Sequence, residues 1–261
     1  MSATLTTADW NPGAYARFRD QRLRPALDLL NAVGQMGAGG IVDLGCGTGS
    51  MAEALRLRGA GRGLTGVDAS PAMLKKARGT GVYDTLQQAD IDEWHPQDTP
   101  GLIYSNAALH WVGTHEALMP RLAAMLSKGG TLAVQMPHQN KAPSHRVWRS
   151  LAEELFPGRV DTMGTPGVMA PVKYEELLSP IGRFRLWETE YYQRLTAEPE
   201  SHPVRRYTEC TYARPILSAL DPDEKADIIR RYEEVMQTAY PVRADGTVLF
   251  PFRRMFFTLT V

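Results

Sequence analysis

The stretch that decides the fold is Ile41-Val42-Asp43-Leu44-Gly45-Cys46-Gly47-Thr48-Gly49. A short apolar run carries one acid and leads into three alternating glycines, and a helical pattern starts at Ser50. This order predicts a strand, a turn with few side chains and then a helix, so that backbone can approach a bound ligand closely. A glycine-rich turn without a ligand is the alternative, but three spaced glycines disfavour it because each costs backbone entropy.

The spacing of the glycines separates two classes of nucleotide-binding loop. The dinucleotide pattern G-x-G-x-x-G requires glycine at position 50, where this chain has Ser50. An acid followed by G-x-G-x-G instead resembles motif I of the class I S-adenosylmethionine-dependent methyltransferases. The resemblance implies that Asp43 lies near the amino group of the cofactor. It also implies that a loop of small residues packs against the methionine and ribose portion, namely Gly45, Cys46, Gly47 and Gly49.

The composition of the 261 residues is that of an ordinary globular protein, with 43% hydrophobic and 22% charged residues. Lys+Arg and Asp+Glu are equal at 29 each, which does not favour nucleic acid or an anionic membrane as a partner. The two cysteines, Cys46 and Cys210, predict neither a disulfide framework nor a metal site. Without a signal-peptide pattern or a long apolar stretch, we expect a cytoplasmic protein. We also expect a monomer or weak homo-oligomer, and we expect it to bind no metal.

Short apolar runs alternate with helical patterns in the first half, which predicts a parallel α/β sheet. We expect an amphipathic helix over 9–33, with Pro25 starting a second helix, and a loop over 157–171. The expected strands are 40–44, 63–67, 84–88, 102–105, 131–135, 183–195 and 248–261. The expected helices are 50–58, 71–78, 115–126, 144–156, 204–220 and 222–239.

Together with the resemblance, this pattern predicts the fold class. It is a Rossmann-like class I methyltransferase fold, with a mostly parallel seven-stranded sheet flanked by helices, added N-terminal helices and a helical cap from the C-terminal half. We expect a single domain over residues 1–261. Its parts are a helical segment at 1–36, a cofactor-binding half at 37–137 and a substrate half at 138–261.

Two further acids follow the next two expected strands. Asp68 ends the second strand, 23 residues after Gly45, where a carboxylate can accept both hydroxyls of a ribose. A role as helix N-cap is the alternative, although Ser70 is the better cap. Asp90 follows the third strand and is expected to accept the amino hydrogens of adenine, unless it belongs to a solvated acidic turn. Other cofactor contacts are expected from the neighbours of these acids, Ala69, Met73 and Ile91.

The fourth expected strand leads into Ser105-Asn106-Ala107-Ala108-Leu109-His110-Trp111. In methyltransferases of this class the loop here faces the transferred methyl group, and we assign Asn106 and Ala107 to the cofactor. The [N/D]-P-P-[Y/F/W] tetrad of nucleic-acid base methylases is missing, which argues against base methylation. His110 and Trp111 are expected to orient the acceptor or exclude water, and packing roles are the alternative for both.

Beyond these motifs the chain resembles one family of the class, the trans-aconitate 2-methyltransferases. The resemblance runs from Trp10-Asn11-Pro12 to Arg254-x-Phe256, and so covers nearly the whole chain. It implies that a carboxylate oxygen attacks the sulfonium methyl of S-adenosylmethionine, giving a monomethyl ester of a small polycarboxylic acid and S-adenosylhomocysteine. A carboxylate with a pKa of ~4 is already ionised at neutral pH, so no general base is required.

The family match also implies which residues bind the two substrates. We expect Arg214 and Arg254 to bind the acceptor, with Tyr192 and His138 as further candidates. The second half has fourteen arginines and three lysines, which suits bidentate carboxylate binding, although most of these arginines are expected to be solvated. At the cofactor, Arg22 or Arg24 is expected to hold the carboxylate, and the remaining N-terminal contact is Tyr15.

The chain departs from the family near the expected acceptor pocket. His110, His138 and Ile216 stand where glutamine, aspartate and an aromatic residue are usual, which leaves the identity of the acceptor open. A methyltransferase for another carboxylate, a phenol or an amine is one alternative, and a non-catalytic S-adenosylmethionine-binding protein is another. A nicotinamide dehydrogenase is opposed by Ser50.

Overall fold

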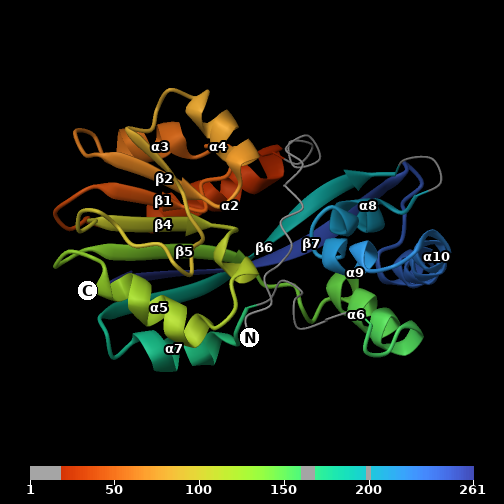
Figure 1. The fold of residues 1–261 in the computed structure, drawn as a ribbon. Helices are drawn as coiled ribbons and strands as arrows, with labels where there is room; N and C mark the ends of the chain where they lie inside the picture. The colour runs from red at the N-terminus through yellow and green to blue at the C-terminus, as the bar shows by residue number, and fades with distance from the viewer. Residues whose placement is uncertain (1–18, 160–167, 198–200) are drawn as a thin grey trace. The chain divides into compact units, whose positions relative to one another are not determined.

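The computed structural model describes residues 19–159, 168–197 and 201–261, with only the backbone described for residues 19–22. In these ranges the strands form one seven-stranded sheet in the order β3-β2-β1-β4-β5-β7-β6 (Figure 1). The first five strands are β1 (Ile41–Leu44), β2 (Leu64–Asp68), β3 (Thr85–Gln88), β4 (Leu102–Asn106) and β5 (Thr131–Pro137). Two long strands complete the sheet, β6 (Arg183–Thr196) and β7 (Thr247–Thr260).

The strands β1 to β5 are parallel and start in register. Ile41 of β1 stands beside Leu64 of β2 and Leu102 of β4, so the carboxyl ends of these strands lie at one edge of the sheet. The strand β7 runs the other way, because Val261 pairs with Gly129 and Gly130 at the start of β5. A mostly parallel, seven-stranded α/β sheet is therefore present, as predicted.

Five described helices pack around this sheet: α2 (Arg19–Ala32), α3 (Ala52–Arg58), α4 (Pro71–Arg78), α5 (His115–Ala124) and α7 (Pro171–Leu178). The short helix α7 was not predicted. The expected helix start at Pro25 is wrong, because α2 continues through this proline. An interior proline removes one helical hydrogen bond. Three buried side chains in the following turns, Ala26, Leu29 and Leu30, outweigh that loss.

The chain divides into two compact units. Of the described residues, the first contains 19–135, 170–186 and 256–261, and the second contains 136–159, 168–169, 187–197 and 201–255. The boundaries of 37–137 and 138–261 expected from the sequence stay a prediction. No helix in the described part of the chain is both long and apolar enough to cross a membrane.

In the second unit, four helices pack on one another: α6 (Pro143–Leu155), α8 (Pro203–Glu209), α9 (Arg214–Ser218) and α10 (Pro222–Ala239) (Figure 1). The ring of Trp148 stacks on Tyr232 with centroids 3.9 Å apart, and its Nε1 donates to Thr208 Oγ1. A single helix over 204–220 was wrong. The chain turns between α8 and α9 because Pro215 has no N–H to continue a helix and instead occupies the first turn of a new one.

Candidate functional site

The loop from β1 to α3 holds its three glycines at positive φ, namely 78° at Gly45, 55° at Gly47 and 80° at Gly49. Only glycine adopts this conformation without strain. A Cβ at Gly45 would overlap the Cβ of Ala108, and one at Gly49 would lie 3.1 Å from the ring of Tyr83. A Cβ at Gly47 would have nothing within 4 Å. Two glycines therefore allow close packing, and Gly47 leaves its side of the loop open.

The end of β2 anchors this loop. The carbonyl of Val67 accepts the N–H of Gly45 at 2.8 Å and that of the next residue at 2.9 Å. The N–H of Gly47 donates to Asp68 Oδ2 at 2.8 Å, and the N–H of Ser70 donates to Asp68 Oδ1 at 2.9 Å. The carboxylate of Asp68 thus ties the glycine loop to the turn that follows β2.

The turn after β2 also decides between the two roles considered for Asp68. Ser70 caps α4, since its Oγ accepts the N–H of Met73 at 3.3 Å. Asp68 is therefore not the cap, and its half-buried carboxylate lies at the carboxyl end of the strand. Met73 is 4% exposed, so its side chain belongs to the core beneath α4. Ala69 is exposed in the same turn.

Asp43 is buried on β1, with an exposed fraction of 3%. Its Oδ2 accepts the hydroxyl of Tyr83 at 2.6 Å. Burial raises the pKa of Asp43 to about 7, the Tyr83 hydrogen bond opposes this rise, and the nearby Asp68 carboxylate adds to it. Burial and the same two carboxylates raise the pKa of the Cys46 thiol. Cys46 is therefore an unreactive neutral thiol in this loop, consistent with its predicted role as a small loop residue.

At the end of β3, Asp90 lies in an exposed turn. Its Oδ1 accepts the N–H of Asp92 at 3.0 Å, which is the hydrogen bond expected of a solvated acidic turn. The neighbouring Ile91 lies near the glycine loop, because a Cβ at Gly45 would be 3.8 Å from its Cδ1. The guanidinium of Arg121, on α5, donates a hydrogen bond to the carbonyl of Ile91 at 2.6 Å. Ile91 therefore lies near the glycine loop, whereas the Asp90 carboxylate lies in the exposed turn that follows β3.

The end of β4 contributes a strained residue and an orphaned polar atom. Ala107 has a φ of 52°, which is unusual for a residue other than glycine, and its N–H donates to the carbonyl of Gln135 at 2.9 Å. Asn106 Oδ1 is buried and has no hydrogen-bond partner among the residues described. In the following 3₁₀-helix η1 (Leu109–Trp111), the rings of His110 and Trp111 lie 5.0 Å apart. A buried acceptor without a donor indicates a place for a ligand.

The four residues predicted to bind the acceptor all belong to the second unit, but they do not share one face of its strands. Arg254 of β7 is 3% exposed and its guanidinium lies 4.8 Å from the ring centroid of Phe252. Its neighbour Arg253 points the opposite way and pairs with Glu190.

His138 and Tyr192 lie on the side of Arg253. His138 pairs with Glu188, which lies two residues before Glu190 on the same face of β6. Tyr192 follows on that face, with its pKa raised by a hydrogen bond from its hydroxyl to Glu190. The two glutamate carboxylates disfavour binding of an anionic acceptor beside His138 and Tyr192. The prediction of acceptor binding therefore rests on Arg254 and on the half-buried Arg214 at the start of α9.

Gln193 is a second orphaned polar group, and the sequence did not single it out. It is 5% exposed on β6, and neither amide atom has a hydrogen-bond partner in the described residues. Residues 191 and 193 alternate with Glu190 and Tyr192, so Gln193 faces away from the carboxylates. A buried amide with both functions unmet is costly, which makes Gln193 a candidate for ligand contact.

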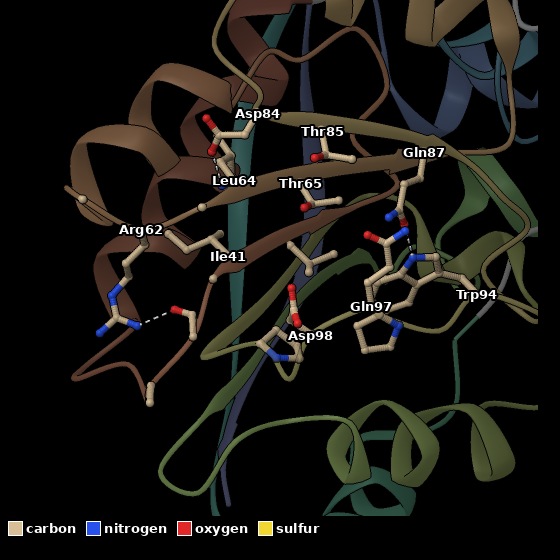
Figure 2. A pocket seen from close by; sticks show the side chains of 18 residues that line it. Ile41, Arg62, Leu64, Thr65, Asp84, Thr85, Gln87, Trp94, Gln97 and Asp98 are labelled. Atoms are coloured by element: carbon tan, nitrogen blue, oxygen red, sulfur yellow. Dashed lines mark hydrogen bonds between the residues drawn. The ribbon is translucent and has the colours of Figure 1, made fainter.

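A pocket of about 710 Å³ is lined by residues at the start of the strands, away from the glycine loop (Figure 2). Two of its polar side chains already bind the protein. Arg62 donates to the carbonyls of Gly37 and Gly39. Trp94 Nε1 donates to Gln87 Oε1 at 2.9 Å (Figure 2). Ligands of open α/β sheets bind at the carboxyl ends of the strands, so this pocket is not the candidate site.

The N-terminal residues assigned to the cofactor are not tested by the structure. Tyr15 lies outside the described residues, and the side chain of Arg22 is not described. Arg24 is exposed on α2. Besides Gln193, the sequence did not single out Tyr83. The signal for it was the pair of glycines, Gly49 and Gly66, that make room for its ring.

Comparison with known proteins agrees with this geometry. A family model described as a methyltransferase domain matches residues 15–163. The trans-aconitate 2-methyltransferase of Paracidovorax citrulli is 41% identical over 95% of this chain and 96% of its own. The solved YcgJ protein of Bacillus subtilis is 14% identical, with a TM-score of 0.56 over 91% of this chain and 98% of its own. A Haemonchus contortus phosphoethanolamine N-methyltransferase, solved with S-adenosylhomocysteine, is 18% identical, with a TM-score of 0.51 over 90% of this chain and 52% of its own.

Proposed function

Because the chain belongs to the trans-aconitate 2-methyltransferase family, we propose that it esterifies a carboxylate of trans-aconitate, or of a related small polycarboxylic acid, using S-adenosylmethionine. The observation that carries this proposal is the glycine loop, which is anchored by Asp68 and open at Gly47. When bound, S-adenosylmethionine supplies a methyl group on a positively charged sulfonium centre.

The residues at the carboxyl ends of β1, β2 and β4 fit this cofactor. The glycine loop offers bare backbone for close approach, and Asp68, at the carboxyl end of β2, is the carboxylate that would accept the ribose hydroxyls. Asp43 provides a carboxyl group for the α-ammonium group, and the orphaned Asn106 Oδ1 provides an acceptor for a donor of the ligand. Ile91 would cover the cofactor from the β3 side, and Asp90 would accept the amino hydrogens of adenine.

The chemistry needs orientation and exclusion of water more than acid–base catalysis. The acceptor carboxylate is ionised at neutral pH, so no residue has to remove a proton. His110 and Trp111 follow β4 directly, and His110 is 9% exposed. We assign them to holding the attacking oxygen in line and keeping water out. Arg254 and Arg214 bind carboxylates of the acceptor that do not react.

The decisive experiment is incubation of the protein with S-adenosylmethionine labelled at the methyl group and a panel of di- and tricarboxylates. We expect trans-aconitate to receive base-labile label as a methyl ester, and the ester position can be read by mass spectrometry. Label on an amine or phenol but on no carboxylate would overturn the acceptor assignment. Tight binding of NAD without binding of S-adenosylhomocysteine would overturn the cofactor assignment.

A matched pair of substitutions tests the acceptor site. Arg254→Ala should raise the acceptor KM at least tenfold, because a charge-assisted pair contributes about 1.5–3 kcal/mol, while S-adenosylhomocysteine affinity stays near normal. Arg253→Ala is the control, since it removes the same charge from the exposed face of the same strand. Equal acceptor KM values in the two variants would remove Arg254 from the site.

We further propose that the enzyme works in the cytoplasm as a monomer or weak homo-oligomer. Neither Cys46 nor Cys210 forms a disulfide in the described structure, as is usual in a reducing compartment. Sedimentation at several protein concentrations tests the oligomeric state, and a stable dimer at micromolar concentration would contradict it.

A further inference from the structure

Tyr83 reaches the cofactor-binding loop from a segment that carries no cofactor motif. It lies between α4 and β3, forty residues after Asp43, and its hydroxyl donates to Asp43 Oδ2 at 2.6 Å. Asp43 is buried on β1, and β2 separates it from β3 in the sheet. The tyrosine side chain therefore has to cross β2 to make this hydrogen bond.

A glycine on β2 makes the crossing possible. Gly66 stands directly beside Asp43 in the register of β1 and β2. A Cβ at Gly66 would lie 2.9 Å from Tyr83 Cε1 and 3.0 Å from Cδ1, closer than packed carbons approach. A Cβ at Gly49 would lie 3.1 Å from the other edge of the ring. The two glycines therefore make room for the tyrosine ring, so that its hydroxyl can donate to the Asp43 carboxylate.

We propose that Tyr83 is a positioning residue, which orients the Asp43 carboxylate and stabilises its anionic form for the α-ammonium group of the cofactor. This inference rests on the proposed S-adenosylmethionine site. The hydroxyl occupies Oδ2 and leaves Oδ1 as the other acceptor of Asp43. A hydrogen bond to a carboxylate favours the charged form, so Tyr83 opposes the effect of burial.

Among the described residues, few charged groups around Asp43 compete with this effect. Asp68 approaches from β2, Cys46 from the glycine loop and Tyr104 from β4. Burial raises the pKa values of the Cys46 thiol and the Tyr104 hydroxyl, so both are neutral near pH 7. Asp68 repels a second anion, which makes the Tyr83 hydroxyl the group that favours ionisation of Asp43.

The test compares Tyr83→Phe with the wild type in two measurements. In the protein without cofactor, carbon-13 NMR of the aspartate carboxyls should show the Asp43 titration midpoint moving to higher pH in the variant. In calorimetry with S-adenosylhomocysteine, the variant should bind about tenfold more weakly at pH 6 and about twofold more weakly at pH 8, as expected for a shift of about one pKa unit.

Three further variants separate positioning from packing. Tyr174→Phe removes a buried hydroxyl that binds His115 in the same unit, and should leave both measurements unchanged. Gly66→Ala should reproduce the Tyr83→Phe shift by displacing the ring. In an Asp43→Asn background, Tyr83→Phe should add no pH dependence.

An unmoved Asp43 midpoint, or an equal loss of affinity at pH 6 and pH 8, would overturn the role of Tyr83. Failure of the wild type to bind S-adenosylhomocysteine would instead overturn the proposed cofactor. In that case the NMR titration still measures whether Tyr83 controls the ionisation of Asp43.

Discussion

Gly45 and Gly47 lie two residues apart in one loop and both have positive φ, yet they face different surroundings. Alanine at Gly47 meets nothing within 4 Å, so Gly47→Ala should cost only the ~1–2 kcal/mol of a left-handed alanine. Alanine at Gly45 would also overlap the Cβ of Ala108, which should add about 1–3 kcal/mol. Urea unfolding of the two variants measures the difference.

Cofactor binding should separate the same two glycines further. In Gly47→Ala, the loss of binding free energy for S-adenosylhomocysteine should exceed the loss of unfolding free energy, because the added methyl group enters the open side of the loop. Equal unfolding free energies for the two variants, or normal cofactor affinity in Gly47→Ala, would contradict this interpretation of the loop.

Among the elements, α10 has the most complete N-terminal cap. Asp221 Oδ1 accepts the N–H of Glu224 at 2.9 Å, and the Glu224 carboxylate accepts the N–H of Asp221 at 3.0 Å. Asp221→Ala should therefore lower the unfolding free energy by about 1 kcal/mol. Asp223→Ala is the control, because it removes an acid from the same first turn without touching the cap. A loss of the same size in both variants would assign the effect to charge.

In the whole molecule, the two units contain buried groups that respond oppositely to pH. In the first unit, burial raises the pKa of Asp43 from 3.8 to about 7. Between these values the folded unit binds more protons than the unfolded chain, so its stability falls as pH rises. In the second unit, burial lowers the pKa of His145 from 6.5 to about 3. There the unfolded chain binds more protons, so stability rises with pH.

Acidification from pH 7 to pH 4.5 should therefore stabilise the first unit through Asp43 and destabilise the second through His145, by roughly 3 kcal/mol from each group. In the first unit, burial also lowers the pKa of His115, which offsets part of the effect of Asp43. The lowered pKa values of Asp227 and Asp245, both in the second unit, act in the same direction as His145. Hydrogen exchange resolved by peptide measures the two units separately. Asp43→Asn should flatten the response of the first unit, and a loss of protection in the first unit relative to the second between pH 7 and pH 4.5 would contradict the prediction.

The positions of Asp43, Asp68 and Asn106 near the ends of their strands were predictable because their signals are local. Each of these side chains stands in the last two residues of a short apolar run, and parallel strands bring such positions to one edge of the sheet. The boundaries of the helices were predicted less well, because proline had opposite effects at two positions. Pro25 lies inside a helix, whereas Pro215 begins one. Burial of the flanking side chains decides between these outcomes, and it is not visible in a local pattern.

The sequence by itself determined the α/β class, the glycine loop and the positions of Asp43, Asp68 and Asn106 near the carboxyl ends of their strands, because these depend on spacing within short segments. The tertiary structure alone decided that Tyr83 reaches Asp43 across Gly66, and that Arg254 and His138 lie on opposite faces. The first fact depends on the strand register, which puts a residue without a side chain beside Asp43. The second depends on the alternation of side chains along β7. Those contacts join residues far apart in the chain, and only the packed fold brings them together.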